Sequence, residues 1–159
     1  MTRMTQSDRI EASVSVGVCV ERRGSLLMVQ KKETGLWGIP GGHLLPEETP
    51  LQGARREVLE EAGIPIIPFA LVGIYYFPKK KGASICFVVR AYVSPTAAFS
   101  PQDIEVKKVE WKDASWVRYA ITSGELYRPE YLGHNLMDWL SGALIPLTLL
   151  REFSVGWAE

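Results

Sequence analysis

One helix in this chain has both of its ends marked by the sequence. Thr49 is a favourable N-cap, Pro50 fits the first helical position because its missing N–H loses no partner there, and Gln52 completes a capping box. Gly63 suits the left-handed residue that follows a helix. The sequence therefore predicts a helix over residues 50–62, and the rest of the fold must pack around it.

Three glutamates within this helix, Glu57, Glu60 and Glu61, are expected on its solvent-facing side, away from the apolar stripe that includes Val58. Like charges one turn apart repel by roughly 0.2–0.5 kcal/mol per pair. Such a cluster is either a solvated helix face, with Arg56 paired to Glu60, or a site for a hard divalent cation. Mg²⁺ prefers oxygen ligands and commonly joins carboxylates to substrate phosphates.

Strand and turn signals alternate on both sides of this helix. Apolar residues at a period of two predict strands, and Gly, Pro and polar clusters predict the turns between them. The expected strands are residues 12–21, 25–30, 66–77, 83–93 and 103–113, with a loop over 33–42 and helical structure over 115–143 interrupted at Gly124, Pro129 and Gly133. Strands before and after a central helix predict an α/β (α+β) fold, a mixed sheet covered by helices.

Composition and charge limit the classes of function that fit this chain. The 159 residues suit one domain with its own core. Lys and Arg balance Asp and Glu at 18 each, so bulk charge favours neither a nucleic-acid nor a membrane partner. Cys19 and Cys86 each lie in an apolar run and are expected to be buried thiols. With no signal-peptide pattern at the start, we expect a cytoplasmic protein with a flexible N-terminus (1–10) and a single domain (11–159).

The spacing of charged residues and glycines around the helix is the strongest signal in the sequence. From Gly42 it reads Gly, five residues, Glu, seven residues, Arg-Glu-Val, one residue, Glu-Glu, one residue, Gly-Ile, ending at Ile64. This pattern resembles the signature of the Nudix hydrolase family at every specified position. The resemblance implies an α/β/α sandwich with a mixed sheet and a catalytic loop–helix–loop. It also implies an enzyme that cleaves a pyrophosphate bond in a nucleoside diphosphate linked to another moiety.

The resemblance assigns a role to each motif residue. The implied ligands of Mg²⁺ or Mn²⁺ are Glu57, Glu60, Glu61 and the carbonyl of Gly41. Glu48 and Arg56 look like a supporting pair that orients Glu57. Gly42 is expected to let the loop backbone approach the helix.

The catalytic base lies outside the motif in many members of this family, on a loop before a strand that ends in Trp. Here Glu105 lies six residues before Trp111 and close to the expected loop, so it is the preferred candidate. Glu110 is a second candidate, but it lies on the alternating strand. Since a motif glutamate itself serves in some members, Glu57 remains a rival.

The candidate substrate contacts are mostly aromatic. Tyr75 and Phe77 share one face of a strand and form either a stacking platform or ordinary packing. Lys79 begins a triple lysine at a turn, which either meets a phosphate or solubilises a sheet edge. A later set, between which the sequence does not choose, is Tyr127, Arg128, Glu130, Tyr131, His134 and Asn135.

Several substrate classes remain open. The short chain resembles the MutT-type nucleoside triphosphate pyrophosphohydrolases, which release a monophosphate and pyrophosphate. Pro78, fifteen residues after Gly63, instead resembles ADP-ribose pyrophosphatases, and nucleotide sugars and dinucleotide polyphosphates are further alternatives. A non-catalytic nucleotide-sensing module is the alternative of another class, but such modules usually lose motif glutamates and this chain retains them all. Both a monomer and a homodimer are compatible with the resemblance.

Overall fold

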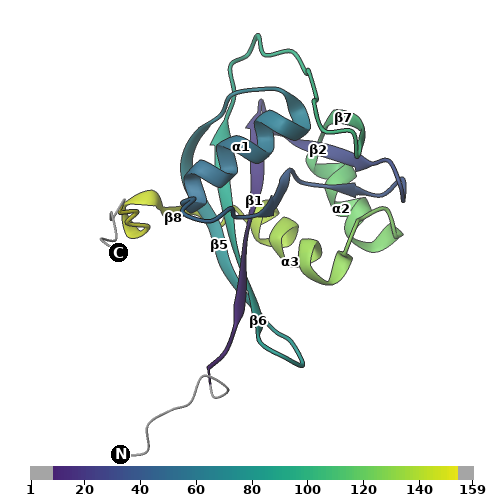
Figure 1. Cartoon of the computed structure of the whole chain (residues 1–159). Helices are drawn as coiled ribbons and strands as arrows, with labels where there is room; N and C mark the ends of the chain where they lie inside the picture. Colours follow the sequence, from purple (N-terminus) through teal and green to yellow (C-terminus); the bar gives the residue numbers. More distant parts are fainter. Residues whose placement is uncertain (1–8, 154–159) are drawn as a thin grey trace, which may run out of the picture.

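The computed structural model describes residues 9–153, which form one mixed sheet with helices on both of its faces (Figure 1). The strands are β1 (Ala12–Arg22), β2 (Ser25–Lys31), β3 (Trp37–Gly38), β4 (Gly41–His43), β5 (Ile67–Pro78), β6 (Ala83–Tyr92), β7 (Val106–Lys112) and β8 (Ile145–Pro146). The helices are α1 (Pro50–Ala62), α2 (Ala114–Ser123), α3 (Pro129–Leu140) and the short 3₁₀ helix η2 (Leu147–Leu149).

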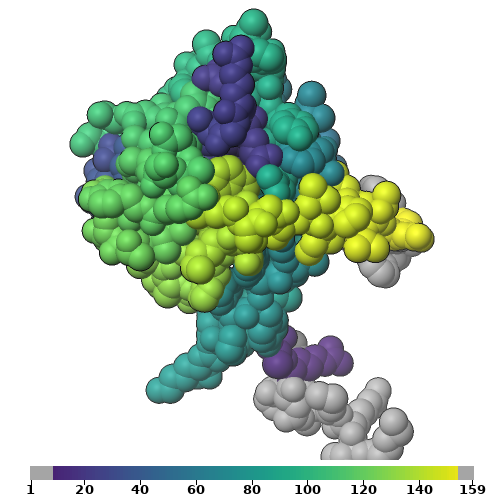
Figure 2. Space-filling model, turned by 180° about the vertical axis from the view of Figure 1, so that it is seen from behind, coloured from purple at the N-terminus to yellow at the C-terminus, as the bar shows by residue number. Residues whose placement is uncertain are grey.

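The sheet follows the order β3-β2-β1-β6-β5-β8, with β4 added to β1 and β7 added to β2. β1 and β6 are parallel, and the other pairs are antiparallel. Seen from behind, α3 and the segment that follows it cross the back of the molecule, and the β5–β6 hairpin projects below them (Figure 2). The expected mixed sheet is therefore confirmed.

Alternate residues of β1 face two separate cores. Val16, Val18 and Val20 are buried in a cluster with Ala54 and other residues of α1. Cys19 is buried in a second cluster on the opposite face, with residues of α2 and α3. Because side chains alternate across a strand, this central strand joins both layers of the sandwich, and the expected α/β/α arrangement is confirmed.

β1 changes partner along its length, and this change positions the loop before α1. Its first half pairs with β4 through Ser15–Gly17, whereas its end pairs with β2 at Glu21 and Arg22. Between these two regions the Val18 N–H donates to the Pro40 carbonyl at 2.9 Å. The Gly41–His43 segment is therefore held against β1, directly beside α1.

Four details differ from the sequence prediction. The loop predicted over 33–42 contains β3 and the start of β4, because backbone pairing to β2 and β1 organises it. Gly133 does not interrupt α3, since its cost of about 1 kcal/mol in a helix is outweighed by the packing of neighbours such as Leu132. β7 begins at Val106, after the predicted start at 103. β8 and η2 follow the predicted helical region and were not expected.

Other expectations concern the ends and the thiols. Of residues 1–10, where flexibility was predicted, 1–8 lie outside the described residues. Cys19 is fully buried and Cys86 partly buried, and both are free. None of the helices described is both long and apolar enough to cross a membrane.

The predicted capping box gives a direct test of what holds α1. Thr49 Oγ1 accepts from the Gln52 N–H at 3.4 Å, and Gln52 Oε1 accepts from the Thr49 N–H at 2.9 Å. Thr49→Ala removes one of these acceptors and is expected to lower the free energy of unfolding by about 0.5–2 kcal/mol. Thr49→Ser keeps the hydroxyl and is the matched control. Equal denaturant midpoints for Thr49→Ala and Thr49→Ser would show that the cap contributes nothing.

Candidate active site

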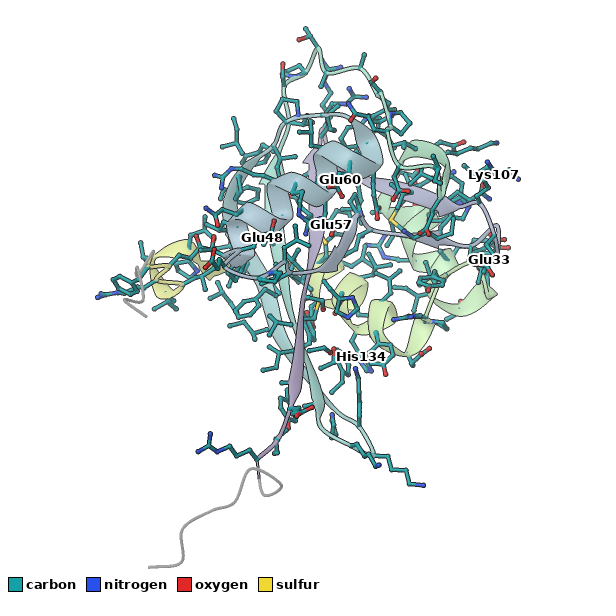
Figure 3. All side chains as sticks on the ribbon, in the orientation of Figure 1. Glu33, Glu48, Glu57, Glu60, Lys107 and His134 are labelled. Carbon is teal, nitrogen blue, oxygen red and sulfur yellow. The ribbon has the colours of Figure 1, made fainter. Side chains whose placement is uncertain are left out.

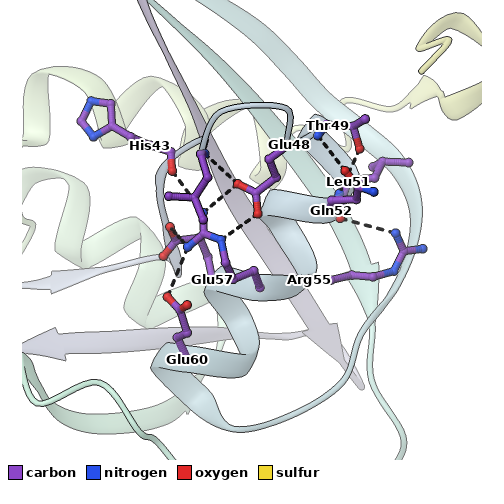
Figure 4. Close-up of polar contacts among 10 residues, drawn as sticks. His43, Glu48, Thr49, Leu51, Gln52, Arg55, Glu57 and Glu60 are labelled. Atoms are coloured by element: carbon purple, nitrogen blue, oxygen red, sulfur yellow. Dashed lines mark hydrogen bonds and ion pairs between the residues drawn. The ribbon is translucent and has the colours of Figure 1, made fainter. Parts of the chain in front are cut away.

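The Arg56 guanidinium is the centre of a polar network between α1 and the segment before it. Its partners His43, Glu48, Glu57 and Glu60 are labelled in Figure 4. The guanidinium forms a bidentate pair with Glu48, with Nε–Oε1 at 2.7 Å and Nη2–Oε2 at 2.9 Å. Its Nη1 contacts Glu57 at 2.8 Å and Glu60 at 3.2 Å, and its Nη2 donates to the His43 carbonyl at 3.1 Å. Arg56 therefore ties three carboxylates of the motif to the loop that precedes the helix.

Glu48 is fixed from both sides. Besides the Arg56 pair, its Oε2 accepts from the Leu45 N–H at 2.9 Å. The hydrogen bond from Arg56 is the main reason that the pKa of Glu48 lies below its ordinary value, and the hydrogen bonds that Arg56 donates to Glu48 are the main reason that the pKa of Arg56 is raised. Both groups are thus held in their charged forms, as suits a pair that orients Glu57.

Gly42 leaves the space that the Glu57 carboxylate occupies. A Cβ at this position would lie 2.4 Å from Glu57 Oε1 and 2.8 Å from Cδ. Any larger residue would push the carboxylate out of place. The loop backbone therefore approaches α1 as expected from the sequence.

The expectation that the three glutamates share a solvent-facing side is wrong for two of them. Glu57 is 8% exposed and Glu61 is 3% exposed, whereas the Glu60 side chain is 51% exposed. The loop through Gly42 covers Glu57, and Glu61 lies against β2, where Lys31 Nζ contacts its Oε1 at 3.1 Å. Figure 3 shows Glu57 and Glu60 on α1 and Glu48 in the segment just before it.

Burial gives Glu61 an unusual protonation equilibrium. Desolvation raises its pKa to about 7, with the charges of Glu57 and Asp103 adding to this rise and Lys31 opposing it. Its second oxygen, Oε2, is buried without a hydrogen-bond partner among the described residues. Glu61 is therefore a buried carboxylate with one oxygen unpaired, next to a second buried carboxylate.

The loop that carries Glu105 is folded over the C-terminal end of α1. The Ser100 N–H donates to the Ala62 carbonyl, and the Gln102 and Asp103 N–H groups both donate to the Glu60 carbonyl, each at 2.9 Å. Asp103 Oδ1 in turn accepts from the Glu105 N–H at 2.8 Å. The helix end and the candidate base are thus connected through backbone contacts.

Glu110 has a different environment from Glu105. It lies on β7, and its carboxylate contacts Lys112 at 2.5 Å and Lys108 at 3.9 Å. Glu105 instead lines a pocket together with Lys32 and Ile104. Glu105 therefore lines a pocket that includes Gly41 and Gly42 of the motif loop, whereas Glu110 is paired with lysines.

Two neighbouring pockets lie along the motif loop, and together we call them the cleft. The part that we call the Glu105 pocket has a volume of about 550 Å³. The part that we call the α3 pocket has a volume of about 250 Å³, and Phe77, Tyr131 and Asn135 line it. Both parts share a lining of Lys31, Gly41, Gly42, His43, Tyr127 and Arg128.

The matches with known proteins agree with this geometry. A family model for the NUDIX domain matches residues 11–129. The chain belongs to the Nudix family. It is a Nudix hydrolase, and enzymes of this family act on nucleotide-linked pyrophosphate bonds with the help of divalent metal ions.

One relative matches over most of the chain, and another matches over less than half of it. Phosphatase NudJ of Escherichia coli K12 is 25% identical over 144 residues, which cover 89% of this chain and 92% of that protein. A MutT-like protein of Streptomyces ambofaciens is 47% identical over 64 residues, 40% of this chain and 42% of that protein.

Among solved structures, a Nudix hydrolase from Nitrosomonas europaea has a TM-score of 0.78 at 24% identity, covering 92% of this chain and all of that one. A bifunctional NMN adenylyltransferase/ADP ribose pyrophosphatase from Francisella tularensis, complexed with AMP and a Mn ion, has a TM-score of 0.67 at 22% identity, over 84% of this chain and 42% of that one. At these identities both structures support the fold.

The residues of the Nudix motif fit a divalent cation. Glu61 Oε2 is buried without a partner within the part of the chain that the structure describes, and carboxylates are the ligands that hard cations prefer. Within residues 9–153 no three acidic, His or Cys side chains converge closely enough to hold a metal ion. Glu57 and Glu61 are instead paired with Arg56 and Lys31 respectively. These cations balance the same negative charge that a metal ion would balance.

The structure places some of the predicted substrate contacts in the cleft and others outside it. Phe77 and Lys79 line the α3 pocket. Tyr75 stacks on Phe77 with ring centroids 6.4 Å apart, but it packs against the second core and its hydroxyl donates to Asp138 at 2.7 Å. Tyr75 is therefore held beside α3 and does not line either pocket. Of the later set, Tyr127, Arg128, Tyr131 and Asn135 line the cleft.

Sequence reasoning missed two residues of the Nudix site. Lys31 ends β2 and faces Glu61, and Asp103 lies close enough to raise the pKa of Glu61. Neither residue belongs to the motif. The one available signal for Asp103 was its place two residues before Glu105; for Lys31, a basic residue at a strand end carries no specific signal.

The raised pKa of Glu61 gives the metal-free Nudix protein a distinctive pH dependence. The folded chain binds more protons than the unfolded chain between pH 4.5, the ordinary value, and about 7, so the free energy of unfolding falls as pH rises through this window. Glu61→Gln removes this dependence. In EDTA, the stability of Glu61→Gln relative to wild type is expected to be greater at pH 8 than at pH 5, by on the order of 1–3 kcal/mol.

Chemical denaturation at both pH values measures this difference. Glu60→Gln changes the same chemical group at a half-exposed position of the same helix and is the matched control. If the relative stability of Glu61→Gln is the same at pH 5 and pH 8, the Glu61 carboxyl does not titrate in this window.

Proposed function

We propose that this Nudix hydrolase converts (deoxy)nucleoside triphosphates to the monophosphate and pyrophosphate with Mg²⁺ as its metal ion. The supporting observation is the lining that the two pockets share. It includes Gly42, which covers the Glu57 carboxylate, and one of the two pockets has an aromatic wall beside α3. A phosphate chain beside Gly42 and a base near α3 therefore fit adjacent parts of the cleft.

The metal ligands of this proposal are Glu57, Glu60, Glu61 and the Gly41 carbonyl. The bound cation would neutralise phosphate oxygens and polarise the phosphoryl group. Glu48 and Arg56 hold Glu57 in place through the contacts described above. Lys31 lines both pockets and pairs with Glu61, so its ammonium is available to a substrate phosphate when metal takes over the charge of Glu61.

Glu105 is proposed as the general base. It would accept a proton from the attacking water as the water oxygen bonds to phosphorus and the bridging P–O bond breaks. Its pocket is continuous with the shared lining of the cleft, and its backbone is fixed by Asp103 and by Lys32, whose N–H donates to the Glu105 carbonyl at 2.7 Å. Glu57 is the alternative base.

A second candidate function is release of orthophosphate. The relative that matches over most of its length is a phosphatase by name, NudJ of Escherichia coli. Attack on a terminal phosphorus would need the same metal ligands and the same base. Only the position of the phosphate chain in the cleft would differ.

The products of turnover distinguish these two functions. With Mg²⁺ and a nucleoside triphosphate, we expect the monophosphate and pyrophosphate, with no activity in excess EDTA. Reaction in ¹⁸O-labelled water, followed by mass analysis of both products, identifies the attacked phosphorus. A diphosphate with orthophosphate would contradict our proposal and support the second candidate. AMP and ribose 5-phosphate from ADP-ribose, with slow triphosphate turnover, would instead support an ADP-ribose pyrophosphatase.

The role of Glu105 has a matched control on the neighbouring strand. Glu105→Gln is expected to lower kcat by about 10²- to 10⁴-fold without a matching rise in KM, because a general base acts chiefly in the transition state. Glu110→Gln makes the same change where the carboxylate pairs with lysines outside the cleft, and its kcat is expected to stay near wild type. An unchanged kcat for Glu105→Gln would transfer the role to Glu57.

A further inference from the structure

Two adjacent arginines, Arg22 and Arg23, lie where β1 ends and turns into β2. Within residues 9–153 neither guanidinium forms an ion pair with a carboxylate. Two neighbouring positive charges repel each other. A bound anion would remove this repulsion, so the surroundings of the two side chains decide whether they form a site.

The turn itself gives no reason for an arginine at position 23. Arg23 has a φ of 49° and Gly24 a φ of 78°. Two-residue hairpin turns with two such left-handed residues favour Asn or Gly at the first position. A larger residue in this conformation costs roughly 1–2 kcal/mol. The contribution of Arg23 therefore lies in its side chain.

Two pockets flank the arginines at the carboxyl ends of β1 and β6, and together we call them the arginine site. One has a volume of about 340 Å³ and includes Tyr92 in its lining, and the other has a volume of about 320 Å³ and includes Trp111. Both are lined by Arg22, Arg23 and Pro95. These volumes lie within the usual range of small-molecule pockets. The concave shape therefore fits a small compound better than the surface of an acidic protein.

The wall of the arginine site is rich in hydrogen-bond donors. The Arg22 guanidinium lies over the Trp111 ring, 4.3 Å from its centroid. Stacking on an aromatic ring orients a guanidinium and leaves its N–H edge available to a ligand. The Trp111 Nε1–H has no acceptor within the described part of the chain, and Ser25 adds a hydroxyl group to the lining.

The acidic residue in the lining does not neutralise these arginines. Glu21 lines the larger pocket, but its carboxylate accepts hydrogen bonds from Arg90 and from Trp139 Nε1. Because side chains alternate along a strand, Glu21 and Arg22 belong to opposite faces of the sheet. Glu21 is therefore already paired, and the positive charge of Arg22 and Arg23 is available to a ligand.

We propose that Arg22 and Arg23 form a second binding site, which holds a phosphate-bearing anion apart from the cleft. A guanidinium group binds phosphate oxygens through two parallel N–H···O bonds, so two such groups suit a ligand with several phosphate oxygens. Among the described residues, none lines both the arginine site and the cleft. Gly17 lines the cleft, and Arg22 lies about 16 Å further along β1. The anion is therefore a molecule other than the one being hydrolysed.

Calorimetry with inorganic phosphate, pyrophosphate and AMP tests this site, in EDTA so that metal-dependent binding in the cleft is absent. Wild type is expected to bind at one saturable site, with an affinity that falls as salt rises. Arg23→Asn is expected to weaken binding by about 10- to 150-fold, because hydrogen bonds to charged groups are lost. Since asparagine suits the turn, the melting temperature of this variant is expected to equal or exceed that of wild type. Arg118→Gln changes an exposed arginine of α2, and wild-type affinity is expected there.

The relative affinities identify the source of the phosphate. Tighter binding of pyrophosphate than of AMP would indicate an inorganic ligand, and the reverse would indicate a nucleotide. Three results would overturn the inference: no saturable binding of any of the three compounds, wild-type affinity in Arg23→Asn, or loss of binding in Lys31→Gln alone, which would place the anion in the cleft. Because no turnover is measured, the result is independent of the proposed reaction.

Discussion

Two buried carboxylates, Glu57 and Glu61, impose the main constraint on this structure. Removing a charged group from water costs several kcal/mol unless an opposite charge and hydrogen bonds compensate. Arg56 supplies that charge to Glu57 from the same helix, and Lys31 supplies it to Glu61 from β2. The compensation is incomplete, because one oxygen of Glu61 remains unpaired and the pKa of Glu61 is raised to about 7. A divalent cation would supply the positive charge that these two carboxylates still lack.

The position of these acidic residues in the helix adds to the excess of negative charge. Glu60 and Glu61 lie in the last turn of α1, at the negative end of the helix dipole, and that turn contains no basic residue. Hydrogen-bond donors and positive charge for this end of α1 must therefore come from other segments of the chain. Backbone N–H groups of residues 100–103 bind the last carbonyls of α1, and Lys31 approaches from the sheet. The loop that carries Glu105 is thus positioned by the same requirement that places Lys31.

The sequence predicts those parts of the site that depend on local rules. The capping box, the left-handed Gly63 and the motif spacing all concern residues near one another in the chain, and the structure contains each of them. The burial of Glu57 was not predictable from helix periodicity, because that analysis assigns charged residues to the outside. β3 and β4 were missed because strands of two and three residues are held by pairing with distant strands. The orientation of Asn135 likewise depends on packing across the sheet.

Two features that lower the stability of the folded chain, a strained residue and an unpaired side chain, lie on α3 beside the cleft. A hydrogen-bonded network stabilises the other end of this helix. Arg128 has a φ of 47° and precedes α3 without a side-chain cap, and Asn135, about two turns later, carries an oxygen that has no hydrogen-bond partner within residues 9–153. At the other end of α3, the Trp139 Nε1–H donates to Glu21 Oε1 at 2.6 Å, and Arg90 joins Glu21 to the Ala143 carbonyl. This network fixes the helix to β1 and β6. Because α3 is anchored there, its N-terminal half retains a residue of strained backbone and an unpaired side chain that both line the cleft, and strain of this kind is typical of functional sites.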